Sequence, residues 1–178
     1  MENKKSKIKF FFIGFVKIGL IYPPLLVLLK YLIFGETYLL GSFIEGLIFS
    51  FIFVGIMCLQ HFSKLKKNGH SVFTDEDLAV NQTDNFELEI TTDQLISKLE
   101  NNPIENFKSM EVSGQSIQMR TRGHLDALSG EKIQIDFKDL DNGVKAISIN
   151  SKPRIFFQLF DQGRNIINVQ AIRNVIES

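Results

Sequence analysis

Two long apolar runs occupy the first third of this 178-residue chain. Residues 10–34 read FFFIGFVKIGLIYPPLLVLLKYLIF, and residues 38–60 read YLLGSFIEGLIFSFIFVGIMCLQ. Because a bilayer core of roughly 30 Å needs about 20 helical residues, each run is long enough to cross a membrane. Only Gly35-Glu36-Thr37 separate the runs. So short a connection predicts an antiparallel hairpin of two transmembrane helices.

The two apolar runs contain a few polar or conformationally special residues. Pro23-Pro24 predict a kink in the first helix, because proline removes a backbone donor and clashes with the preceding turn. Lys17 lies near one end of the first run, where its side chain can reach the headgroups. Alternatively, the span begins near Ile18, and Ile8 to Lys17 lies along the interface.

Glu45 is the one carboxylate inside the second run. A charge in a membrane span is unfavourable and marks a functional position by default. Three interpretations are open: pairing with Lys30 on the facing helix, an interfacial position near the connection, or proton or ion handling. We expect pairing with Lys30. Small residues in this run would let the two helices approach closely; they are Gly41, Ser42, Gly46, Ser50 and Gly55.

Lysines flank the hairpin on the side away from the short connection. The residues concerned are Lys4, Lys5, Lys7 and Lys9 before the first run and Lys64, Lys66 and Lys67 after the second. Positive flanks stay in the cytoplasm. The sequence therefore predicts a multi-pass protein of the cytoplasmic (inner) membrane with both termini cytoplasmic. A signal peptide is the alternative, but the first run is long, lacks a small-residue cleavage site and precedes a second span.

Charge and cysteine content exclude several functions for the rest of the chain. Residues 61–178 carry fourteen Lys and Arg against seventeen Asp and Glu, and this acidic balance argues against general nucleic-acid binding. The single cysteine, Cys58, permits no intrachain disulfide and no Cys-rich zinc site. His124-x-Asp126 offers two residues of a metal site at best. We therefore expect no metal, no cofactor and no enzymatic activity.

The sequence predicts three segments. Residues 1–60 form the basic tail and the hairpin, and residues 61–85 form a basic exit and a linker with a short strand at 71–74. Residues 86–178 form a small α+β domain. Alternating apolar residues predict strands at 86–90, 108–112, 117–122, 133–138 and 144–151. Asp141-Asn142-Gly143 predicts the hairpin turn between the last two. Helical spacing predicts helices at 93–99, with an N-cap at Thr91 or Thr92, and at 161–177. The expected fold is an antiparallel sheet of four to five strands with two helices on one face.

The most distinctive local pattern is Asp161-Gln162-Gly163-Arg164-Asn165-Ile166-Ile167-Asn168-Val169. In a structural interpretation, Asp161 or Asn165 caps the last helix, Gly163 turns the chain, Arg164 pairs with Asp161, and Asn168 bonds back to a strand end. In a ligand-binding interpretation, the helix N-terminus and Arg164 attract an anion. The further arginines that would converge on that anion are Arg120, Arg122 and Arg154.

The tract from Val112 to Ile176, with its strand meander, Ser151-Lys152-Pro153 and the Asp-x-Gly-x-Asn-x-x-Asn-Val motif, resembles uncharacterised bacterial proteins of Bacteroidetes type. Some of these carry a membrane hairpin before a small α+β domain. The resemblance implies fold and anchoring, and it carries no established activity. Many of these proteins have an aromatic residue where this chain has Gln162. The resemblance therefore does not predict a ligand stacked on an aromatic ring at this position.

Three functions are consistent with these features. The first is a membrane-anchored cytoplasmic module that binds a ligand or a partner. The second is a lipid- or anion-binding or enzymatic domain at the membrane surface, using Arg154, Arg164 and Phe156, Phe157 and Phe160. The third is a small subunit of a membrane complex, including an immunity-type protein. The expected partners are the lipid bilayer and a membrane protein or a second copy of the chain.

Overall fold

The structure is a computed structural model that describes residues 2–35, 39–69, 74–75, 78–102, 104, 107–122, 130–154, 161 and 163–178, without the side chains of Glu2, Asn3 and Asn142. The chain divides into two compact units, Met1–Leu78 and Ala79–Ser178. The predicted strand at 71–74, the segment around His124 and Asp126, Gln162 and the three phenylalanines at 156–160 lie largely or wholly outside the described residues.

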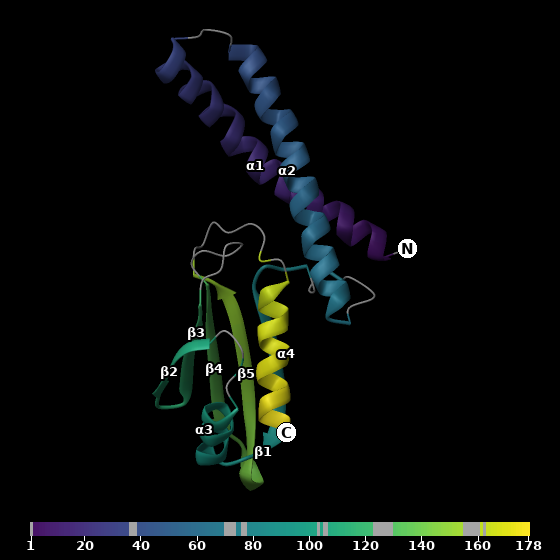
Figure 1. The fold of residues 1–178 in the computed structure, drawn as a ribbon. Coiled ribbons are helices and arrows are strands. Elements are labelled where there is room, and N and C mark those ends of the chain that lie inside the picture. Colours follow the sequence, from purple (N-terminus) through teal and green to yellow (C-terminus); the bar gives the residue numbers. More distant parts are fainter. Residues whose placement is uncertain are drawn as a thin grey trace. The chain divides into compact units, whose positions relative to one another are not determined.

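The first unit is the predicted helical hairpin, formed by α1 (Glu2–Phe34) and α2 (Leu39–Lys67) (Figure 1). Both helices are long and apolar enough to cross a membrane. Helix α1 runs through Lys17, Pro23 and Pro24 as one element. Helix α2 continues seven residues past Gln60, so the expected basic exit is largely helical. Lysines in the last turn of α2 favour this extension because they lie at the negative end of the helix dipole.

A stripe of small residues on α2 packs against α1. The stripe recurs every four residues and comprises Ser42, Gly46, Ser50, Val54 and Cys58, all buried. A methyl group added at Gly46 would lie 2.6 Å from the Cα of Pro23. Aromatic rings flank the contact: Phe11 and Phe51 have ring centroids 5.2 Å apart, and those of Tyr22 and Phe49 are 4.4 Å apart. The predicted close approach therefore involves Ser42, Gly46 and Ser50, whereas no described atom lies within 4 Å of a Cβ placed at Gly41.

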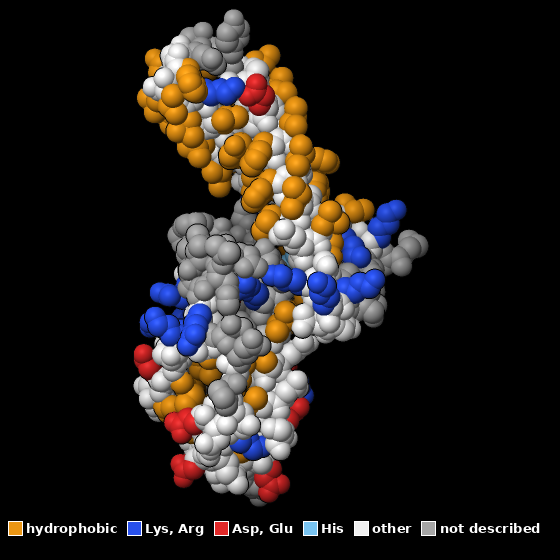
Figure 2. Space-filling view, viewed as in Figure 1, with side chains coloured by type: hydrophobic (Ala, Val, Ile, Leu, Met, Phe, Trp, Pro, Cys, Tyr) orange, Lys and Arg blue, Asp and Glu red, His pale blue; other side chains and the backbone are white. Residues whose placement is uncertain are grey.

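The outer surface of the hairpin is apolar. Leu20 is 71% exposed on α1 and Leu40 is 74% exposed on α2, and similar exposed side chains continue along both helices. Figure 2 shows these hydrophobic side chains covering the visible face of the hairpin. A surface of this kind and length is unfavourable in water and is suited to lipid.

The second unit contains a five-stranded antiparallel sheet in the order β1-β5-β4-β3-β2. The strands are β1 (Gln82–Glu89), β2 (Phe107–Ser113), β3 (Ser116–Thr121), β4 (Glu131–Asp139) and β5 (Val144–Pro153). Asp141–Gly143 form a short 3-10 turn between β4 and β5. Strand β1 begins four residues before the predicted position because Gln82 pairs with Ser151 of β5.

Two helices cover one face of this sheet, which confirms the predicted fold class (Figure 1). Helix α3 (Thr92–Asn101) starts with a capping box between Thr91 and Gln94. Helix α4 (Arg164–Glu177) places Val169, Ile172 and Ile176 on the sheet. The core is completed mainly by Leu95 and Leu99 of α3 and by Ile117, Met119, Ile133, Ile135, Phe137, Ile147 and Ile149 of the sheet.

The opposite face of the sheet is polar. Side chains alternate along each strand, so the residues between the buried positions of β3, β4 and β5 point away from the helices. They are half-buried or exposed and include Gln118, Gln134, Asp136, Ser148 and Asn150. Within the described part of the domain, no helix or strand covers this open face.

Candidate functional site

The carboxylate of Asp161 caps the start of α4. Its two oxygens accept hydrogen bonds from the backbone N–H groups of Gly163 and Asn165, at 3.0 and 2.9 Å. Gly163 has a φ of 73°, in the left-handed region that glycine adopts without strain. Asp161 is only 1% exposed. Burial raises the pKa of its carboxyl to about 6, although the backbone hydrogen bonds oppose this shift.

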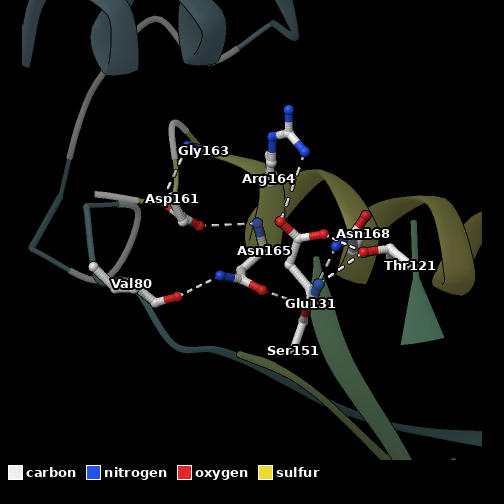
Figure 3. Close-up of polar contacts among 9 residues, drawn as sticks. All are labelled: Val80, Thr121, Glu131, Ser151, Asp161, Gly163, Arg164, Asn165 and Asn168. Carbon is white, nitrogen blue, oxygen red and sulfur yellow. Dashed lines mark hydrogen bonds and ion pairs between the residues drawn. The ribbon is translucent and has the colours of Figure 1, made fainter. Parts of the chain in front are cut away.

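Asn165 connects α4 to two other segments. It is fully buried, its side-chain oxygen accepts a hydrogen bond of 2.6 Å from the Ser151 hydroxyl, and its amide donates to the Val80 carbonyl at 2.7 Å. Asn168 donates a long hydrogen bond of 3.5 Å to the same Ser151 oxygen. Figure 3 shows these residues converging from α4, β5 and the segment before β1. Three of the predicted site residues therefore hold the helix in place.

A buried carboxylate absent from our sequence predictions lies beside this network. Glu131 is 2% exposed, accepts a hydrogen bond from the Thr121 hydroxyl, and donates its backbone N–H to the Thr121 oxygen at 2.8 Å. Its other carboxylate oxygen lies 3.8 Å from Nη1 of Arg164 (Figure 3). One feature of the sequence could have indicated its burial: Glu131 lies two residues before Ile133, so it is on the same, inward-facing side of β4.

Arg164 and the other predicted arginines do not converge on one anion. Arg164 lies on the helix-covered face of the sheet with Glu131. Arg120 and Arg154 instead line a cavity of about 220 Å³, and Arg122 is not among its lining residues. Two further cations that we did not predict as site residues, Lys132 and Lys152, complete its lining together with Pro153.

This second cluster is the cationic row, defined as Arg120, Lys132 and Lys152. Arg120 pairs with Lys132 in register, and Lys132 pairs with Lys152. Because each follows or precedes an inward-facing residue (Thr121, Ile133 and Ser151), all three lie on the open face. Arg120, Lys132 and Lys152 are far apart in the sequence, so only the register of the strands shows that they form a row.

The polar residues of the hairpin have simpler surroundings. Nζ of Lys30 lies 2.6 Å from Oε2 of Glu45, as expected for a pair between the two helices. Lys17 is exposed on α1. Among the described residues, no three His, Cys, Asp or Glu side chains are grouped as metal ligands.

No protein-family model, curated protein or solved structure matches this chain. The network around Asp161 and Asn165 is buried and bonds mainly to its own fold. The cationic row is open to solvent and lies on the uncovered face, so it is the stronger candidate for contact with another molecule.

Proposed function

We propose that this protein is a membrane-anchored binding module, in which the α1–α2 hairpin crosses the bilayer and the domain uses the open face of its sheet to bind a ligand or a partner in the cytoplasm. The observation that carries the anchoring is the apolar exterior of both helices, exemplified by Leu20 and Leu40. Lipid is the solvent in which that exterior is stable.

The polar residues of the hairpin support the same proposal. The Lys30–Glu45 pair lies between the two helices and neutralises both charges where each is unfavourable in lipid. The lysines Lys64, Lys66 and Lys67 lie in the last turn of α2, where anionic headgroups attract them. With lysines also before α1, the charge asymmetry favours a cytoplasmic domain.

The binding role is supported by the contrast between the two faces of the sheet. One face carries α3, α4 and the apolar core. The other face presents charged and amide side chains, and a shallow groove of about 400 Å³ runs over Ala146 and Ser148 between Glu87 and Lys138. Polar side chains on a rigid sheet can fix the orientation of a bound molecule.

Anchoring and topology are tested on the full chain in its native membranes. The protein should stay in the pellet after extraction with alkaline carbonate. After Cys58→Ser, a Thr37→Cys variant should react with a membrane-impermeant maleimide added outside intact cells, whereas an Asn174→Cys variant should react only after lysis. Release by carbonate would exclude the anchor, and the opposite labelling pattern would exclude the cytoplasmic domain.

The binding face is tested separately by photocrosslinking. A photoreactive amino acid at Gln134 on the open face should give adducts in the native membrane, and the same group at Glu100 on α3 serves as the control. Adducts only from position 100 would contradict binding through the open face, while leaving the anchor intact.

A further inference from the structure

The cationic row concentrates positive charge where the sheet geometry disfavours it. Neighbouring strands are about 4.8 Å apart, so Arg120, Lys132 and Lys152 lie across roughly 10 Å. Like charges directly opposite each other destabilise an antiparallel pair. The row contains two such oppositions, Arg120 with Lys132 and Lys132 with Lys152.

The residues that the structure describes do not neutralise this charge. Within the described part of the chain, no carboxylate forms an ion pair with Arg120, Lys132 or Lys152. Glu111 of β2 belongs to the next row, where it pairs with Gln118. The remainder of the chain after residue 60 has an excess of acidic residues. The row is therefore a local concentration of cations that runs against the composition of its domain.

The shape of the site limits its ligand. Its cavity of about 220 Å³ is smaller than the roughly 300–1,000 Å³ that encloses a drug-sized molecule. Arg154 lines the same cavity, two residues beyond Lys152. Several cations around a small open hollow suit a compact anion with oxygens pointing in several directions, because guanidinium and ammonium groups form strong charge-assisted bonds to each oxygen.

We propose that the cationic row and Arg154 bind a phosphate group, carried either by a phospholipid headgroup or by a free phosphate compound. This proposal rests on the binding role of the open face and specifies its ligand. One feature of the chain favours a phospholipid headgroup as the carrier of this phosphate. Strand β1 begins at Gln82 opposite Ser151, the neighbour of Lys152, so the segment that follows α2 joins the sheet at the end that carries the row.

The test uses the full chain in neutral detergent and separates the two sources. Native mass spectrometry counts phosphatidic acid or phosphatidylcholine molecules retained by the protein, and calorimetry measures binding of inorganic phosphate and pyrophosphate. The main variant carries Arg120→Gln, Lys132→Gln and Lys152→Gln. The matched control is Lys98→Gln, which removes a lysine from α3 on the helix-covered side of the sheet and keeps a side-chain donor for the Ile176 carbonyl.

The wild-type chain should bind phosphatidic acid, a soluble phosphate, or both, more tightly than phosphatidylcholine. The triple variant should lose at least about tenfold in affinity, since charge-assisted hydrogen bonds are removed, and Lys98→Gln should bind like the wild type. Response in the lipid arm alone assigns the headgroup, and response in both arms assigns the phosphate group itself. Equal binding by wild type and triple variant, or binding of no probe by the wild type, overturns the proposal.

Folding is controlled within the same experiment. Removing opposed like charges should leave the urea midpoint of the triple variant, without ligand, equal to or above that of the wild type. Should the triple variant fail to fold, Lys132→Gln alone removes the centre of the row and should still weaken binding several-fold. Carbonate extraction of either variant should match the wild type, so loss of phosphate binding is distinguishable from loss of the anchor.

Discussion

Gly46 of α2 lies directly against Pro23 of α1, so that a Cβ at Gly46 would be 2.6 Å from the Cα of Pro23. The nearest atoms belong to the backbone and ring of a proline, which cannot rotate away. Proline also leaves a gap in the hydrogen-bond ladder of its own helix. The hairpin thus combines a small residue on one helix with a rigid residue on the other where the two helices approach closely.

Gly46→Leu should destabilise the hairpin by about 1–3 kcal/mol, because overpacking forces the two helices apart. Gly41→Leu is the matched control, since no atom of the described residues lies within 4 Å of a Cβ at that position. Unfolding of the full chain by SDS in mixed micelles, followed by helical circular dichroism, measures the difference. Equal unfolding midpoints for the two variants would show that the Gly46–Pro23 contact does not hold the hairpin.

Lys30 and Glu45 should behave as an energetically coupled pair. Lys30→Met alone leaves the Glu45 charge uncompensated on an apolar helix and should cost up to about 3 kcal/mol. The double variant Lys30→Met with Glu45→Gln should recover most of that loss. The same SDS titration over the four proteins gives the coupling as a double-mutant cycle. Additive losses would mean that each side chain is solvated independently despite their 2.6 Å separation.

The stability of the α+β domain should depend on the ionisation of Asp161. Its pKa is raised from 3.8 to about 6 in the folded protein, so between these values the folded state binds the proton more tightly than the unfolded state. Stability should therefore fall as pH rises from about 4 to about 6, by up to about 3 kcal/mol, and then level off.

Asp161→Asn should remove this part of the pH dependence, although it also removes one of the two oxygens that cap α4. Urea titrations at several pH values, on the full chain in micelles, provide the comparison. The other carboxyl groups also contribute to the change of unfolding free energy with pH. The informative quantity is therefore the difference between wild type and variant in the slope of unfolding free energy against pH, below pH 6. An unchanged slope would exclude Asp161 as its source.

Asn165 should be the most sensitive amide of the buried network. Asn165→Ala leaves the Val80 carbonyl and the Ser151 hydroxyl without their buried partner and should cost about 2–4 kcal/mol. Asn168→Ala removes only a 3.5 Å hydrogen bond and should cost less than about 1 kcal/mol. Urea unfolding of the two variants at pH 7 measures both. A larger loss of stability for Asn168→Ala than for Asn165→Ala would contradict this prediction.

Much of the fold follows from periodicity. The apolar runs predicted both helices of the hairpin, and the alternation around Ile133 and Ile147 predicted two strands whose cores were placed correctly. The ends of the elements were predicted less accurately. Strand β1 begins at Gln82 because it pairs with β5, and no local sequence pattern encodes this pairing. Similarly, α2 extends to Lys67 through residues that could equally have formed a linker.

The sequence by itself determined the class of this protein: apolar length set the hairpin, and alternation set the antiparallel sheet. Only the tertiary structure decided which polar residues meet. It placed Asp161 and Asn165 inside the domain as supports of α4, whereas Arg120 and Arg154 lie with Lys132 and Lys152 around one cavity. The physical reason is strand register: a one-residue shift would move each side chain to the opposite face, and register depends on long-range pairing.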